Sequence, residues 1–193
     1  MKKIITIILS LVILINSVRA FTSMQAAFSS FLSYKKIILP TALLQRLDVD
    51  DKNGLIECKL INTRVQFGKY NSMSNEIYVF NYFADTSFNQ PGISIGCYTF
   101  VHNNWIEVTD AVMPAINFYD YYGTTKAPPK MYANAVQYRF LLHKNKTLQI
   151  VIEPRVKGQD ARFDRVYDQR RYAAASTRWN KKEGRFELTK WLK

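Results

Sequence analysis

A cluster of arginines interleaved with aromatic residues is the part of this sequence best equipped to bind a charged partner. Phe163 and Tyr167 lie among six basic side chains, which are Arg155, Lys157, Arg162, Arg165, Arg170 and Arg171. Arginine guanidinium groups bind phosphates and sulfates through paired hydrogen bonds and stack on aromatic rings. The cluster therefore predicts a site for an anionic partner. The alternative is that Asp160, Asp164 and Asp168 neutralise these arginines in surface ion pairs.

Three tyrosines form a second candidate site. Tyr119, Tyr121 and Tyr122 fall within Asn117–Gly123, a segment that the pattern predicts to be an exposed loop. Aromatic rings on such a loop can stack on sugar rings, since each ring has an apolar face and a polar tip. The alternative is that the three rings cover one end of a sheet and belong to the core.

No catalytic motif is present. His102 and His143 lack the nucleophile context that acyl transfer requires, and no glycine loop for phosphate is found. Glycoside hydrolysis needs two carboxylates across a cleft, and Glu107 and Glu187 occupy matching places in two predicted hairpins. Strand glutamates usually pair with Lys or Arg on a neighbouring strand, however. We therefore expect a protein that is not an enzyme and has no cofactor.

The acidic stretch Asp48–Gly54 looks like the start of a calcium loop, but its register is wrong. With Gly54 at the sixth loop position, the twelfth falls on Leu60 and not on the glutamate that calcium requires. We predict instead that Asp50 or Asp51 caps a helix running through Ile61, with a strand from Leu55 as the alternative.

Cys58 and Cys97 are the only cysteines in the chain. An exported protein can form a disulfide, but two buried thiols packed separately are equally compatible with the sequence. With no Cys-x-x-Cys motif and two histidines in the chain, no metal site is expected.

The first twenty residues have the pattern of a secretory signal peptide. Lys2 and Lys3 precede the apolar run Ile4–Ile15, and Val18-Arg19-Ala20 loosely matches a cleavage site. A transmembrane anchor is the alternative, but a span needs roughly 20 apolar residues and this run is shorter. The sequence thus predicts export to the periplasm or the extracellular space, and one α+β domain over residues 21–193.

The positive charge lies almost entirely in the second half of the chain. Residues 21–120 carry seven Lys and Arg against nine Asp and Glu, whereas residues 121–193 carry 17 against six. Such asymmetry indicates an anionic partner or surface, although a charged, solvated face that keeps the protein soluble would give the same composition.

The hydrophobic periodicity predicts short N-terminal helices followed by an antiparallel meander. Helical spacing runs over Phe21–Ser33 and Ala42–Leu47. Alternating or β-rich runs predict strands over Val65–Tyr70, Glu76–Ala84, Ile93–Val101, Trp105–Thr109, Ala135–Lys144, Thr147–Val156, Tyr172–Asn180 and Arg185–Leu192. The segments Asn75–Thr109 and Lys146–Thr189 share an order of strand, long loop and hairpin. This internal similarity predicts two four-stranded halves, unless ordinary hairpin chemistry alone explains the shared order.

The N-terminal third resembles a group of bacterial proteins. Leu39-Pro40, Leu43-Leu44 and Leu47, followed by acidic residues and Leu55-Ile56-Glu57, resemble the opening of small exported proteins of unknown function from Bacteroides-type bacteria. In that group a helical start leads into an antiparallel meander. The resemblance covers about residues 21–70 and implies location and fold, since the group has no assigned activity.

These observations together predict an exported binding protein with a basic C-terminal face for an anionic envelope component or an acidic protein. Export argues against nucleic acid as the target, and no later stretch of the mature chain is predicted to cross a membrane. The alternatives are an envelope glycan hydrolase and an inhibitor of a secreted enzyme. An inhibitor would present a protruding loop such as Asn117–Lys130.

Overall fold

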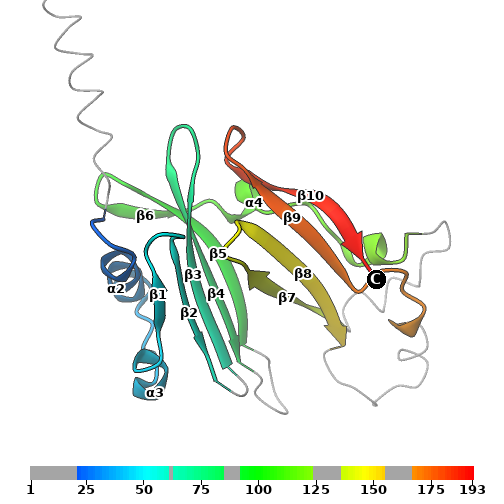
Figure 1. Ribbon diagram of the computed structural model, residues 1–193, viewed down its shortest axis with the longest axis horizontal. Helices are drawn as coiled ribbons and strands as arrows, with labels where there is room; N and C mark the ends of the chain where they lie inside the picture. The colour runs from blue at the N-terminus through cyan, green and yellow to red at the C-terminus, as the bar shows by residue number, and fades with distance from the viewer. Residues whose placement is uncertain (1–20, 61–62, 85–91, 124–135, 155–166) are drawn as a thin grey trace, which may run out of the picture.

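Two antiparallel sheets pack against each other, and two short helices cover the far side of the larger sheet (Figure 1). The computed structural model describes residues 21–60, 63–84, 92–123, 136–154 and 167–193. The six-stranded sheet has sequential order and comprises β1 (Asp48–Asp50), β2 (Leu55–Lys59), β3 (Thr63–Asn71), β4 (Glu76–Ala84), β5 (Gly92–Val101) and β6 (Asn104–Glu107). The four-stranded sheet, ordered β10-β9-β8-β7, comprises β7 (Val136–Leu142), β8 (Thr147–Pro154), β9 (Ala174–Asn180) and β10 (Arg185–Leu192).

This architecture confirms the predicted α+β class and the antiparallel meander. Every strand pairs antiparallel with its neighbour in sequence within its own sheet. The described residues form ten strands, whereas eight strand ranges were predicted. They divide as six and four instead of as two equal halves, although β4–β6 and β8–β10 do form three-stranded meanders of the same order.

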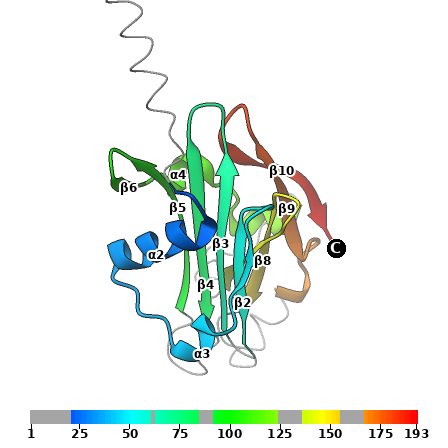
Figure 2. The same cartoon turned by 60° about the vertical axis from the view of Figure 1, so that its left-hand side comes forward.

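The N-terminal helix α2 (Met24–Lys35) covers the six-stranded sheet through its aromatic face (Figure 2). Ser23 caps the helix by accepting the N–H of Ala26 at 3.1 Å. Phe28 and Phe31 are buried and pack on Phe67 of β3, with ring centroids 5.3 and 5.5 Å apart. The second helix, α3 (Thr41–Leu44), is shorter than predicted and buries Leu43.

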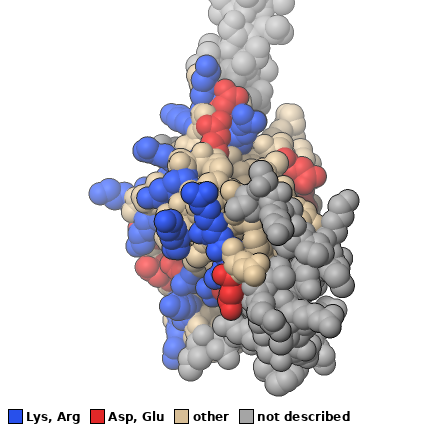
Figure 3. Space-filling view, turned by 90° about the vertical axis from the view of Figure 1, so that its right-hand side faces the viewer, with Lys and Arg blue, Asp and Glu red and all other residues tan. Residues whose placement is uncertain are grey.

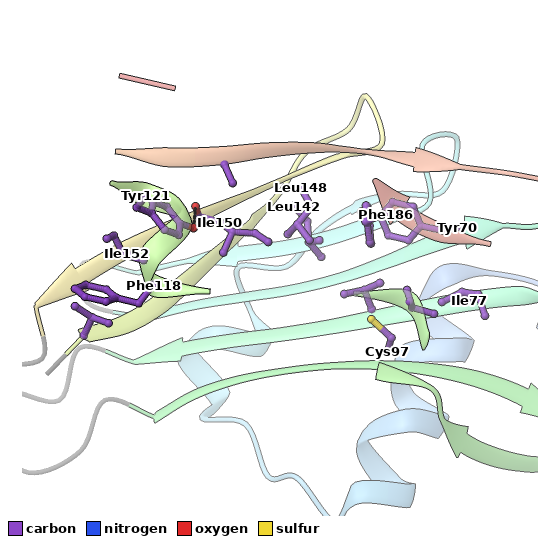
Figure 4. Packing of buried hydrophobic residues seen from close by; sticks show 14 of the residues in the cluster. Tyr70, Ile77, Cys97, Phe118, Tyr121, Leu142, Leu148, Ile150, Ile152 and Phe186 are labelled. Atoms are coloured by element: carbon purple, nitrogen blue, oxygen red, sulfur yellow. Dashed lines mark hydrogen bonds between the residues drawn. The ribbon is translucent and has the colours of Figure 1, made fainter. Parts of the chain in front are cut away.

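Both faces of the six-stranded sheet are covered, so each strand contributes to two cores. On β3, Val65 and Phe67 pack toward the helices, whereas Tyr70 packs toward the four-stranded sheet. On β4, Tyr78 and Val79 divide between the two cores in the same way. Figure 4 shows the second core, whose labelled side chains are Tyr70, Ile77, Cys97, Phe118, Tyr121, Leu142, Leu148, Ile150, Ile152 and Phe186.

Two buried amides join the edge of the four-stranded sheet to the face of the six-stranded one. Gln66 of β3 donates to the carbonyl of Leu142 at 2.9 Å and accepts the Leu142 N–H at 3.0 Å. Asn81 of β4 donates to the carbonyl of Phe140 at 2.8 Å and to the Gln66 side-chain oxygen at 3.0 Å. Because β7 is an edge strand, these side chains satisfy backbone groups that would otherwise be buried without a partner.

A lysine in the β7–β8 turn makes a second link between the sheets. The Lys146 ammonium donates to the carbonyl of Asn53 and, at 2.7 Å, to that of Lys69. It also lies 5.0 Å from the centroid of the Tyr70 ring. Burial, with Lys69 nearby, lowers the pKa of Lys146 below its usual value. Through this one cation, the β7–β8 turn docks on the β1–β2 turn and on β3.

The helix predicted from Asp50 or Asp51 through Ile61 is wrong, and the alternative strand from Leu55 is correct. Residues 48–59 form the β1–β2 hairpin, in which Leu55, Ile56 and Cys58 are all buried. A strand buried on both faces loses its polar alternation, which is why its pattern can be mistaken for a helix. The Asp51 carboxylate instead accepts the N–H of Met24 at 2.7 Å.

The two cysteines belong to different cores and do not form a disulfide. Cys58 packs with the helices, whereas Cys97 packs with the four-stranded sheet. Burial raises the pKa of the Cys97 thiol to about 12 and also raises that of Cys58. Both residues therefore act as small apolar side chains.

Replacing Gln66 by leucine should destabilise the protein strongly. The substitution leaves the buried N–H and C=O of Leu142 without partners, at about 1–3 kcal/mol for each group. We expect chemical denaturation to show a loss on the order of 3 kcal/mol. The matched control is Gln149→Leu on β8, because Gln149 makes no side-chain hydrogen bond within the described residues. This substitution should lower the unfolding free energy by less than about 1 kcal/mol. Equal costs for the two variants would contradict the proposed role of Gln66.

Both thiols should be unreactive in the folded protein and free in the unfolded one. The thiolate is the reactive form, and burial of both groups suppresses it. We expect negligible reaction with a thiol reagent under native conditions and two reactive groups per chain in denaturant without reductant. A mass lower by two hydrogens in the non-reduced protein would indicate a disulfide and contradict this packing.

Candidate anion-binding surface

The predicted arginine cluster is described only at its C-terminal end. Arg155, Lys157, Arg162 and Arg165 lie outside the described residues. Arg170 is packed: it donates to the carbonyl of Tyr167 at 3.0 Å, its guanidinium lies 3.9 Å from the centroid of that tyrosine's ring, and Asp168 is 3.9 Å away. Arg171 is exposed and lies near the ring of Tyr172.

The tyrosine loop is packed and not exposed as predicted. Phe118–Tyr121 form the 3-10 helix η1, which is capped by Asn117. Tyr121 is fully buried, and its hydroxyl donates to the carbonyl of Ile150 at 2.7 Å. Tyr122 is 5% exposed, and burial raises its pKa to about 12. The expected exposure is therefore wrong for Tyr121 and Tyr122, which cover the four-stranded sheet, while Tyr119 is half-buried.

The outer face of the four-stranded sheet carries a row of cations that sequence reasoning did not single out. In β9 and β10, Thr177 and Phe186 face the core, so strand alternation directs Arg178 and Arg185 to the opposite face. A register shift between Leu188 and Lys190 pairs Lys190 with Ser176 and so places Lys190 on that outer face as well. The β9–β10 turn adds two exposed lysines. We call these five residues the basic face: Arg178, Lys181, Lys182, Arg185 and Lys190. The side of the molecule that carries the C-terminal strands shows Lys and Arg gathered over it (Figure 3).

Ion pairs neutralise only part of this surface. Glu187 lies 3.4 Å from Arg185, and Glu153 lies 2.8 Å from Arg139 at the other edge of the sheet. Among the described residues no carboxylate comes within 4.0 Å of the charged groups of Arg178, Lys181, Lys182 or Lys190. From residue 136 on, the described ranges hold 11 Lys and Arg against four Asp and Glu. The surface therefore keeps a net positive charge.

The carboxylates considered for catalysis are engaged in structural contacts. Glu107 lies on β6 and pairs with Lys35 at 3.5 Å. Glu187 lies on β10 in the other sheet, where it accepts the side-chain amide of Asn180 at 2.9 Å in addition to its pairing with Arg185. His102 occupies the β5–β6 turn with a φ of 49°. These contacts lend no support to a glycoside hydrolase.

The acidic hairpin segment makes structural contacts through Asp50. Within the described residues, no three His, Cys, Asp or Glu side chains gather to hold a metal ion. Asp50 accepts hydrogen bonds from the side chain and backbone of Asn53, at 2.9 and 3.0 Å, and lies 3.0 Å from the Lys144 ammonium. The Asn53 hydrogen bonds, together with Lys144, lower the pKa of Asp50 to about 2.

The comparisons with known proteins support the fold and leave the activity open. No family model matches the chain, and no curated protein sequence matches it. One solved structure, described as a domain of an uncharacterized protein from Porphyromonas gingivalis W83, is similar with a TM-score of 0.56 and 13% sequence identity. The alignment covers 74% of this chain and 73% of the other. The likeness is consistent with the resemblance to Bacteroides-type proteins, and at this identity it shows the fold alone.

No helix among the described residues combines the length and apolar character needed to span a bilayer.

Acidification should weaken the protein through Asp50. Its pKa of about 2 in the folded state lies below the ordinary value of about 3.9, so the stabilisation is complete above pH ~4 and is lost as the pH falls toward 2. We expect Asp50→Asn to flatten this part of the pH dependence of the unfolding free energy. Asp48→Asn is the control, because its more exposed carboxylate lies 3.8 Å from Lys144. An unchanged slope in Asp50→Asn would contradict the assignment.

Proposed function

We propose that this chain is an exported binding protein whose basic face engages an anionic component of the cell envelope. The observation that carries the proposal is the set of exposed cations on β9, β10 and their turn that have no carboxylate partner within the described residues. By contrast, Lys69 pairs with Glu76 at 2.8 Å and is neutralised within the fold, whereas the unpaired charges of the basic face lie together on one surface.

The shape of the surface favours an extended, multiply charged partner. Neighbouring strands lie about 4.8 Å apart, and same-face residues along a strand about 6.8 Å apart. The basic face therefore presents its charges as a spread array on a sheet. Each exposed contact contributes little, about 0.2–1 kcal/mol, so useful affinity requires several at once. A repeating anionic glycan or lipid surface supplies them, whereas a single small anion does not.

The enzyme and inhibitor alternatives have less in their favour. The strand carboxylates Glu107, Glu153 and Glu187 each have a basic partner. In Asn117–Lys130, the segment expected to protrude in an inhibitor, residues 117–123 form a capped helical turn packed on the sheet and residues 124–130 lie outside the described residues. The second class of anionic partner is an acidic protein, and the experiment below distinguishes it from an envelope component.

Neutralising three cations of the basic face should abolish most envelope binding. The variant Arg178→Gln, Lys182→Gln and Lys190→Gln keeps side-chain length and removes three exposed charges. In co-sedimentation of residues 21–193 with purified envelope fractions at about 0.1 M salt, we expect about tenfold weaker retention than for the wild type. Retention of the wild type should itself fall at about 1 M salt, where the screening length shortens from ~10 Å to ~3 Å.

The matched control removes the same charge from the opposite half of the molecule. Lys36, Arg46 and Lys52 are exposed there, and Lys36 is changed to Asn because its φ of 54° suits that residue. Arg46 and Lys52 are changed to Gln. Equal loss in both variants would show that net charge alone matters. Salt-insensitive retention, or none, would reject the envelope target, and recovery of an acidic protein with the wild type alone would assign the face to that class.

A further inference from the structure

A small groove lies where the edge of β7 crosses the ends of β2, β3 and β4, away from the basic face. Its volume is about 290 Å³, at the lower end of the usual range for ligand pockets. We call it the Arg64–Arg139 groove, and its lining residues are Lys59, Leu60, Thr63, Arg64, Phe83, Arg139, Phe140 and Leu141. It exists because the Gln66 and Asn81 amides fix β7 across the face of the larger sheet.

Three cationic side chains from three strands converge on this groove. Arg64 stands opposite Lys59 in the β2–β3 register, so both side chains occupy one face. Arg139 reaches the groove from β7, and its guanidinium lies 5.6 Å from the centroid of the Phe83 ring. Register thus pairs Lys59 with Arg64, and the docking of β7 adds Arg139, which lies 75 positions beyond Arg64 in the sequence.

The two arginines keep donors available for a ligand. Glu57 contacts Arg64 at Nε, 3.3 Å away, and Glu153 contacts Arg139 at Nη2, 2.8 Å away. A guanidinium has five N–H donors, so one carboxylate does not use them all. The Nε of Arg139 is buried and has no hydrogen-bond partner among the described residues. A buried donor without an acceptor is costly, so this Nε adds nothing to the pairing of Arg139, and the Nη groups are the donors that a ligand would meet.

The remaining walls are apolar, which defines the rest of the ligand. Leu60, Phe83, Phe140 and Leu141 supply aliphatic and aromatic surface, and Thr63 adds a hydroxyl. We propose that the Arg64–Arg139 groove binds a small carboxylate with a flat apolar body, its carboxylate on the two guanidinium groups and its body against Phe83 and Phe140. This site goes beyond the basic face, shares none of its residues, and takes one discrete ligand in place of an extended surface.

The direct test is a titration of the wild-type protein with benzoate, followed by amide chemical shifts. We expect saturable binding with a Kd on the order of 1 mM. The shifts should map to Lys59, Arg64, Phe83 and residues 139–141. Benzylamine has the same ring with opposite charge and should not bind. The hollow between β10 and the helix α4 (Thr109–Val112) has a volume of about 630 Å³. Its charged lining is Asp110, Asp120, Glu187 and Arg185, and because Arg185 is paired with Glu187 this hollow should show no benzoate shifts.

Variants separate the groove from the basic face. Arg64→Gln and Arg139→Gln should each weaken benzoate binding by about tenfold or more, since each removes a charged hydrogen bond. Arg46→Gln, an exposed arginine outside the groove, should leave benzoate binding unchanged, and so should the triple substitution of the basic face. Circular dichroism and thermal unfolding check that each variant folds. If a variant does not fold, the chemical-shift map of the wild-type protein still tests the location of the site.

Several outcomes overturn the proposal. Absence of saturable shifts with benzoate, equal binding of benzylamine, or shifts confined to the basic face would each exclude the groove as a carboxylate site. If inorganic phosphate bound as tightly as benzoate, the groove would still be an anion site, but the proposed role of the ligand's apolar body would be wrong. Because the envelope assay depends on other residues, loss of envelope binding with benzoate binding intact would reject the basic-face function and leave this inference standing.

Discussion

The structure depends on how one exposed sheet edge is concealed. The N–H and C=O of Leu142 point away from β8, toward the face of the six-stranded sheet, where water cannot reach them. The Gln66 amide supplies the acceptor and the donor that a neighbouring strand would have supplied. Asn81 repeats the arrangement with a single bond to Phe140. Two side chains thus replace a strand, which lets the edge of one sheet lie against the face of another without unpaired backbone groups.

This joint decides what the rest of the molecule presents to solvent. With β7 held across the larger sheet, the apolar side of β8 and β9 closes over Tyr70, Ile77 and Val79. The opposite side of β9 and β10 faces outward with its cations. The same crossing leaves a groove along the edge of β7, which Arg64 and Arg139 line from different sheets. The basic face and the groove are therefore two consequences of one docking geometry.

The local hydrophobic pattern of the sequence was sufficient to predict most of the helices and strands. Approximate alternation predicted β7, β8 and β10, because each of these strands has a mainly apolar side toward the core. Gly184 takes a φ of 65° in the β9–β10 turn. Alternation failed at Leu55–Lys59, where both sides are buried, and at Tyr121, whose polar hydroxyl disguised a core residue.

The site was harder to predict than the fold. Alternation marks Arg178 and Arg185 as polar positions of their strands, but it groups Lys190 with Phe186, because the register shift that turns Lys190 outward leaves no local signal. Gln66 and Leu142 are 76 positions apart, and no local pattern distinguishes a buried glutamine that pairs with backbone from an exposed one on a strand. The division into two sheets followed from that contact and could not be foreseen without it.

Hydrogen exchange at the Leu142 amide tests this account most directly. An N–H on an edge strand normally exchanges quickly because water reaches it. If the Gln66 oxygen holds it in a buried joint, its protection factor should approach that of amides in the central strands β3 and β4. Exchange as fast as that of an exposed edge amide would show that the two sheets are not fixed in this way, and the docking geometry behind both proposed sites would fall with it.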